Sequence, residues 1–182
     1  SFDTSMGFTP LDGIMMGTRC GSIDPAVVTY LIKDEGMSAA QVDSLLNKKS
    51  GFLGVSGISS DWRDVCAAAD KGEHRAVVAK KMVAHQLRKY IGAYAAAMGG
   101  IDVLIFTAGI GENSSTMREI GTQGLEFLGI EIDHELNKTM ARGQIVNLSA
   151  KDAKVTTLVI PTDEEYMIAL DTERIVKEAK NK

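Results

Sequence analysis

The chain has 182 residues, 45% of them hydrophobic and 24% charged, and its formal net charge is −4. This length fits one large domain or two small ones, and the lack of a basic stripe argues against nucleic-acid binding. The longest apolar runs are far shorter than the ~20 residues that a membrane-spanning helix needs, and no signal-peptide pattern opens the sequence. We therefore expect a cytoplasmic protein without a membrane association.

The first half of the sequence reads as a series of helices. A loop with one short helix at most is predicted over 1–24, and a glycine-rich loop over 50–60. Capping residues and glycine stops predict helices over 24–36, 38–49, 61–71 and 73–98. The absence of an initiator Met favours a piece of a longer protein.

The second half alternates strands and helices. Continuous apolar runs predict strands over 103–106 and 155–161, and the first of these suits a strand covered on both faces. Helices are predicted over 114–129, 134–142 and 162–180. The alternation favours an α/β fold with parallel strands. Two strands are few for an open sheet, which suggests missing sequence or a partner.

The stretch "TAGIGEN" (107–113) follows the first predicted strand. Ligands of open α/β sheets bind beyond the carboxyl ends of the strands, and glycine lets the backbone approach a ligand closely. The stretch is neither a P-loop nor a dinucleotide fingerprint. Two interpretations stay open: a phosphate- or nucleoside-binding loop, or a tight turn with Asn113 or Ser114 as the cap of the next helix.

The stretch "IPTDEE" (160–165) follows the second predicted strand. Thr162 and Glu165 have the spacing of a capping box, with Glu165 at the third helical position. Glu164 then remains as a candidate ligand of a hydrated Mg²⁺, although acids in a first helical turn are also favoured by the helix dipole.

Two more stretches contain candidate binding residues. In "MMGTRCGSIDP" (15–25), Arg19 is flanked by small residues and suits a phosphoryl group, although a surface salt bridge is the commoner role of an arginine. In "SSDWRDV" (59–65), we interpret Asp61 as a helix cap and Trp62 as a core residue, with a nucleoside contact as the alternative. The three histidines lack catalytic spacing and are interpreted as structural or surface residues. The two cysteines lack metal-type spacing and are interpreted as reduced thiols.

Together, "DTSMGFTPLDGIMMGTRCGSIDP", "SSDWRD", "FTAGIGENS" and "VIPTDEE" resemble four motifs of the acetate kinase family, in that family's order and spacing. The resemblance covers essentially the whole chain. It implies a ribonuclease-H-like, actin-like ATPase domain of the acetate and sugar kinase/Hsp70/actin superfamily, with a helical insertion at about 24–71. It also implies that residues 1–182 are the C-terminal, nucleotide-binding half of a two-domain kinase.

The resemblance also implies roles for individual residues. Arg19 matches the family's catalytic arginine, and Glu164 matches its magnesium-associated glutamate. The positions matching nucleotide-binding residues are Asp61, Trp62, Arg63, Gly109, Ile110, Gly111, Glu112 and Asn113. Gly109 and Gly111 are expected to be glycine because a side chain there would collide with the nucleotide. A catalytic Asp, a His and a metal-associated Asn of the family are expected to lie outside this chain.

The implied activity is a phosphotransferase reaction with a carboxyl group as acceptor, namely reversible phosphoryl transfer between ATP and acetate to give acetyl phosphate and ADP, with Mg²⁺. The implied partners are these small molecules and a second subunit in a homodimer. A propionate or butyrate kinase of the same family is an alternative. A non-catalytic nucleotide-binding and dimerisation module is another alternative, because we expect the chain alone to be inactive.

Overall fold

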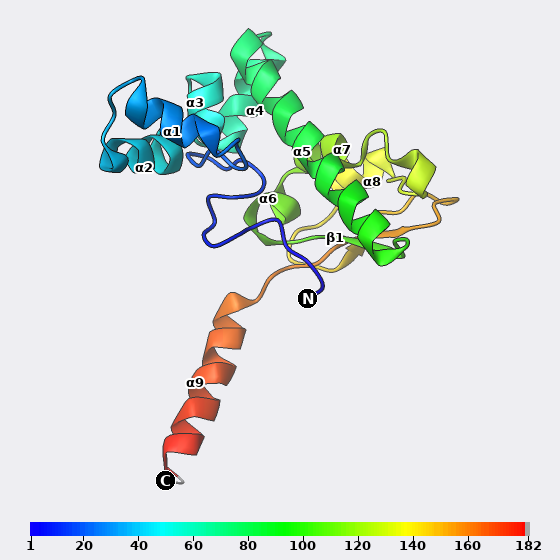
Figure 1. Cartoon of the computed structure of the whole chain (residues 1–182). Helices are drawn as coiled ribbons and strands as arrows, with labels where there is room; N and C mark the ends of the chain where they lie inside the picture. The colour runs from blue at the N-terminus through cyan, green and yellow to red at the C-terminus, as the bar shows by residue number, and fades with distance from the viewer. Residues whose placement is uncertain (181–182) are drawn as a thin grey trace. The chain divides into compact units, whose positions relative to one another are not determined.

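A computed structural model describes residues 1–180 of the chain, which divide into two compact units, one up to residue 101 and the other from residue 102 onward (Figure 1). The first unit is helical and the second contains the sheet. Within the described residues, no helix is long and apolar enough to cross a bilayer. Both cysteines are free thiols.

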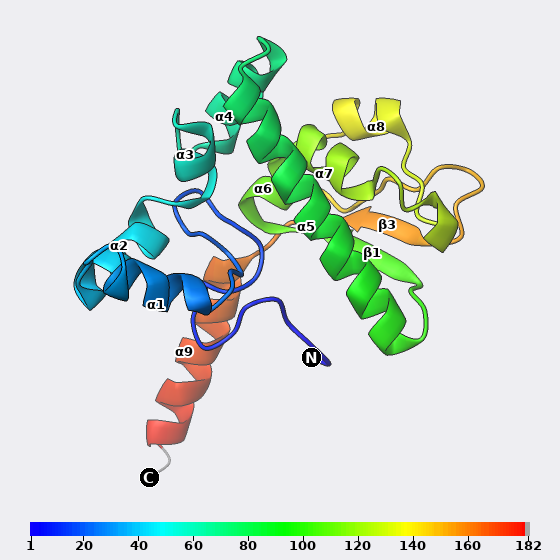
Figure 2. The ribbon, with the colours of Figure 1, turned by 45° about the horizontal axis from the view of Figure 1, so that its top comes forward.

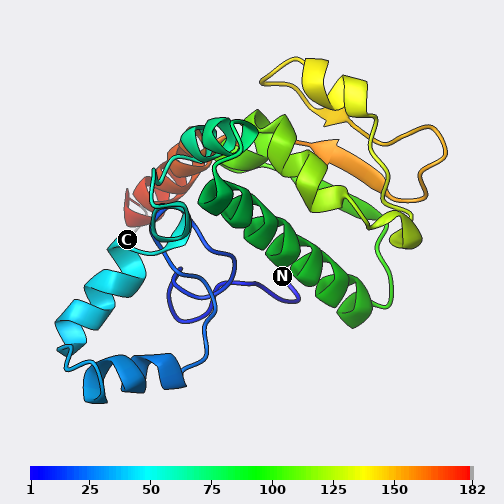
Figure 3. The same cartoon turned by 90° about the horizontal axis from the view of Figure 1, so that it is seen from above.

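The first unit contains five helices among its described residues. They are α1 (Ala26–Lys33), α2 (Ala39–Lys48), α3 (Gly51–Ser56), α4 (Trp62–Asp70) and α5 (His74–Met98). The predicted capping box starts α2, where the Ser38 side chain and the Gln41 side chain each accept a backbone N–H. Figure 3 shows α1 and α2 meeting at the short turn between them. The predicted helices 24–36, 38–49, 61–71 and 73–98 are therefore confirmed.

Residues 1–24 form the predicted loop, without a helix. One prediction for this unit is wrong, because the predicted loop 50–60 contains α3. Helix α3 is stabilised by core packing, because Phe52 contacts Trp62 of α4 with ring centroids 5.2 Å apart. Both α3 and α4 pack against α5. Burial of this aromatic pair outweighs the low helix propensity of the glycines in α3.

The second unit contains a three-stranded sheet in the order β1-β3-β2. Strand β1 (Val103–Phe106) pairs in parallel with β3 (Thr156–Val159), as predicted, and Phe106 lies opposite Val159 (Figure 2). The antiparallel strand β2 (Val146–Asn147) was not predicted. Two residues are too few for a hydrophobic period, so only their pairing with β3 reveals the strand.

The core of the second unit lies on one face of this sheet and consists of Phe106, Ile132, Leu148 and Val159. The side chains of Val103 and Ile105 point to the other face and are 46% and 50% exposed. The prediction that both faces of the 103–106 strand are covered is therefore wrong within this chain. β1 is an edge strand here, and the face that carries Val103 and Ile105 is about half exposed.

Five helical segments complete the described part of the second unit. They are α6 (Ala108–Asn113), α7 (Ser115–Thr122), the 3₁₀ helix η1 (Glu126–Leu128), α8 (His134–Thr139) and α9 (Glu164–Lys180). The single helix predicted over 114–129 is instead two segments, α7 and η1, whereas the predicted helices 134–142 and 162–180 appear with shorter bounds. The predicted loop 107–113 is instead the short helix α6, which follows β1 directly.

Candidate functional site

A cleft of about 460 Å³ opens where the chain leaves the two parallel strands. Its lining comes from the β1–α6 junction and from the β3–α9 junction, namely Ala108, Gly109, Glu112, Thr162, Asp163, Glu164 and Glu165. The two stretches singled out by the sequence, 107–113 and 160–165, therefore meet in space. They meet because parallel neighbouring strands end at the same edge of a sheet.

The two junctions are hydrogen-bonded to each other. The hydroxyl groups of Thr107 and Thr162 lie 2.7 Å apart, and the Thr162 hydroxyl also accepts the Ala108 amide at 3.1 Å. In return, the Thr162 amide donates to Oε1 of Glu112 at 2.8 Å. One carboxylate oxygen of Glu112 is thus engaged by the backbone of the second junction. These bonds hold the two walls of the cleft together.

The glycines of α6 have ordinary helical conformations. The positive φ of this segment falls on Ala108, at 58°, and neither Gly109 nor Gly111 has a positive φ. A Cβ added to Gly109 would meet nothing within 4 Å, and one added to Gly111 would only reach ordinary contact with the Phe106 backbone. Neither the turn nor internal packing therefore requires glycine at 109. Access of a ligand to the backbone stays a hypothesis for this position.

The start of α9 differs from the predicted capping box. The N-cap is Asp163, whose carboxylate accepts the Tyr166 amide at 3.0 Å, because the Thr162 hydroxyl is already bonded across the cleft. Glu165 is consequently not the third helical residue, and the capping box assigned to Thr162 and Glu165 is wrong. Glu164 is the first residue of α9, is exposed, and makes no hydrogen bond or ion pair with any described residue.

The environment of Glu164 can be compared with the needs of a magnesium ion. Among the described residues, no group of three acidic, His or Cys side chains could hold a metal. Magnesium does not require such a cage, since it keeps several waters and often binds through one or two carboxylates and substrate phosphates. An unengaged carboxylate in a cleft fits that mode of binding.

Arg19 belongs to the first unit and lies in a loop that is bonded to α2 and α3. The Phe52 amide donates to Met16 O at 2.8 Å, and the Cys20 amide donates to Leu46 O at 2.9 Å. The loop approaches Gly51 so closely that a Cβ there would lie 2.0 Å from Met16 O. Among the described residues Arg19 has no carboxylate partner; its guanidinium donates only to Sδ of Met16, at 3.6 Å. The alternative of a surface salt bridge therefore has no support here.

The residues 61–63 have structural roles in the first unit. Asp61 caps α4 by accepting the Arg63 amide, and the Arg63 guanidinium bonds to the same carboxylate. Mainly through these side-chain bonds, the pKa of Asp61 is lowered to about 2. This contribution to stability is present above the ordinary pKa of 3.8 and is lost as the pH falls toward 2. Trp62 is 5% exposed, so its side chain packs in the core. A nucleoside contact of these residues stays a prediction.

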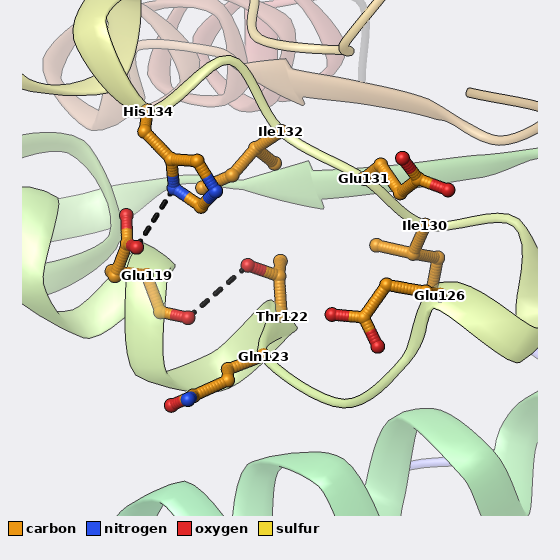
Figure 4. Close-up of a pocket in the computed structure, with 8 residues that line it drawn as sticks. All are labelled: Glu119, Thr122, Gln123, Glu126, Ile130, Glu131, Ile132 and His134. Atoms are coloured by element: carbon orange, nitrogen blue, oxygen red, sulfur yellow. Dashed lines mark hydrogen bonds and ion pairs between the residues drawn. The ribbon is translucent and has the colours of Figure 1, made fainter. Parts of the chain in front are cut away.

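A second hollow, of about 420 Å³, lies beside α7 and η1 (Figure 4). Three carboxylates line it, and Glu119 pairs with Nδ1 of His134 at 2.7 Å. None of the residues predicted for the site lines this hollow. The cleft between the two junctions is therefore the stronger candidate, because position at the strand ends and motif residues coincide there.

The sequence patterns did not single out Arg118, whose side chain binds α6 near the cleft. Arg118 of α7 is 2% exposed and donates to the carbonyl groups of Gly111 and Glu112 at 2.8 and 2.9 Å. Its place four residues after the cap of α7 gives no sign of burial, because arginine is usually exposed. Only the tertiary structure shows this contact with α6.

Comparison with known proteins gives consistent matches over almost the whole chain. A family model described as the acetokinase family matches residues 1–170. An acetate kinase of Caldanaerobacter subterraneus subsp. tengcongensis is 56% identical over 99% of this chain and 45% of its own length. The chain thus spans about 45% of that curated relative.

Solved structures show the same relationship. The crystal structure of Porphyromonas gingivalis acetate kinase superimposes with a TM-score of 0.87 at 52% identity, over 94% of this chain and 43% of that chain. A propionate kinase from Francisella tularensis subsp. tularensis SCHU S4 gives a TM-score of 0.84 at 40% identity, over 92% and 42% of the two chains. The predicted fold class and the resemblance stated from the four motifs are confirmed.

Proposed function

Because this chain belongs to the acetokinase family, we propose that it is the nucleotide-binding C-terminal part of an acetate kinase. The proposed reaction is phosphoryl transfer between ATP and acetate, giving ADP and acetyl phosphate. The observation that carries the proposal is the cleft at the strand ends, which brings Gly109 and Glu164 into one lining. A propionate acceptor is the second candidate, because a propionate kinase is among the structural neighbours.

The roles within this proposal follow from the chemistry of each group. The open backbone at Gly109 and Gly111, with Ile110 and Asn113 beside it, would contact the nucleotide. Arg19 would contact the transferring phosphoryl group, since a guanidinium suits three-oxygen phosphate geometry and charge stabilisation dominates phosphoryl transfer. A contribution of residues 61–63 to nucleoside binding belongs to the same proposal.

Glu164 would hold Mg²⁺ together with phosphate oxygens of the nucleotide. The ion, when bound, supplies neutralisation of phosphate charge. Glu164 suits this role because its carboxylate is exposed in the cleft and has no described protein partner. A cytoplasmic location and a homodimer are further parts of the proposal, supported by the two free thiols and by the family match, respectively.

Calorimetric titration of the chain with ADP tests the proposal. We expect ADP binding that Mg²⁺ strengthens. Glu164→Gln should remove the Mg²⁺ effect and leave the metal-free affinity within about twofold. The matched control is Glu173→Gln on the same helix, where the carboxylate pairs with Lys177 instead. An unmodified chain that is folded but binds no ADP would contradict the proposal.

A further inference from the structure

Arg118 is a buried cation without a buried anion to balance it. Its side chain is 2% exposed, and among the described residues it forms no ion pair with a carboxylate. Burial lowers the pKa of its guanidinium. A charge in such a place is tolerated only where hydrogen bonds satisfy it. The hydrogen bonds of Arg118 therefore indicate its role in the structure.

The guanidinium joins the end of α6 to α8. Nη1 donates to the carbonyl groups of Gly111 and Glu112, at 2.8 and 2.9 Å, while Nε donates to Oδ1 of Asn137 at 2.7 Å. Nη2 also donates to the backbone carbonyl of Asn137, at 3.1 Å. Asn137 is itself 1% exposed and donates to Ser115 O at 3.0 Å. Asn137 is thus held in the core of the unit, and the guanidinium ties the end of α6 to it.

Helix α6 needs such an anchor more than a longer helix does. The last four carbonyl groups of any helix lack intrahelical partners, and α6 has only six residues. A cation at a helix C-terminus also favours the helix dipole. The other end of α6 is held by the Thr162 hydroxyl, which accepts the Ala108 amide. At the far end, Arg118 binds the carbonyl groups of Gly111 and Glu112, and the Glu112 side chain accepts the Thr162 amide.

We propose that Arg118 is a positioning residue, which sets the nucleotide affinity of α6 without touching the nucleotide. The guanidinium fixes the carbonyl groups of residues 111 and 112, and thereby the backbone that faces the cleft. This inference rests on the proposed nucleotide binding at α6. It predicts that the geometry of the planar fork matters, since the ammonium group of lysine cannot reproduce four such bonds.

The test is Arg118→Lys in the 182-residue chain, which keeps the charge. We expect the Kd for ADP to rise about tenfold, within the usual range of coupling between sites. Backbone amides of residues 109–113 should exchange hydrogen faster while those of β3 stay protected. The matched control is Arg75→Lys, because Arg75 also bonds two helix-terminal carbonyl groups, those of Gly54 and Val55 in α3. It should leave ADP affinity within about twofold.

Asn137→Ser is the second variant, in case Arg118→Lys does not fold. It removes the Oδ1 acceptor of Nε and should give a smaller rise in Kd and in exchange at 109–113. Faster exchange at 109–113 with unchanged ADP affinity would overturn the proposal, because Arg118 would then serve the fold alone. If the unmodified chain binds no ADP, the proposed function fails, and unchanged exchange in both variants would separately show that Arg118 does not hold α6.

Discussion

Gly109 shows how a single residue can separate a folding role from a binding role. Its backbone does not have a positive φ, and a Cβ would have free space around it. An alanine there would fit this unit without strain and would improve helix propensity. Selection for folding alone would therefore not favour glycine at this position. We call the remaining possibility, that glycine lets a ligand approach the backbone, the ligand-approach explanation. It can be tested with an alanine at this position, which should increase stability but weaken ligand binding.

We predict that Gly109→Ala raises the free energy of unfolding slightly, by up to about 1 kcal/mol, and weakens ADP binding about tenfold, or ~1.4 kcal/mol. Thermal unfolding and calorimetry measure the two effects. The control is Gly92→Ala in α5, where a Cβ also meets nothing within 4 Å. It should stabilise the chain without changing ADP affinity. Equal ADP affinity of Gly109→Ala and the unmodified chain would refute the ligand-approach explanation.

At the scale of elements, α6 is held between its neighbours rather than by its own hydrogen bonds. Ala108 has a φ of 58°, which disfavours any residue with a Cβ. The Thr162 hydroxyl accepts the amide of this strained residue, and Arg118 binds the carbonyl groups at the other end. A six-residue helix is not stable alone in water. The position of α6 at the cleft thus depends on the β3–α9 junction and on α7.

We predict that Thr162→Val lowers the free energy of unfolding by about 1 kcal/mol, because the Ala108 amide loses its acceptor. Hydrogen exchange should increase first at residues 108–113. Thr172→Val in α9 is the control, since its hydroxyl donates only within its own helix, to Ile168 O. If both variants changed exchange at 108–113 equally, the hydroxyl of Thr162 would have no special role in holding α6.

At the scale of the whole molecule, the chain corresponds to only part of a longer relative. It spans about 45% of the length of its curated relative, and the structure divides it into two compact units. The residues proposed for the site lie in both units, with Arg19 in the first and Glu164 in the second. The catalytic Asp and His that the resemblance implies are expected outside the chain.

We predict that the purified 182-residue chain binds ADP but does not form ATP from ADP and acetyl phosphate. Positioning of both substrates supplies much of the rate in phosphoryl transfer, and an incomplete site cannot position the acetyl phosphate. A coupled assay for ATP checks this, with a complete acetate kinase as the positive control. Turnover by the chain at a rate comparable to that control would show that the chain contains every essential group.

Several features could be predicted from the sequence because they depend on residues close together in the chain. The capping box at Ser38, the long helix α5 and the strand 103–106 each follow from a local pattern, and all three are confirmed. The meeting of 107–113 with 160–165 was also predictable, because parallel neighbouring strands end at one edge. The four motifs identified the family in the same way.

Other features were decided by contacts between distant residues. From the sequence, we predicted that Thr162 belongs to a capping box. Its hydroxyl instead accepts the amide of Ala108, 54 residues away across the cleft, and Asp163 is the cap. The burial of Arg118 was not predicted from the sequence, because it depends on the hydrogen-bond partners that α6 and α8 provide. Local propensity depends on neighbours in the sequence, whereas these hydrogen-bond partners come from segments that only the fold brings together.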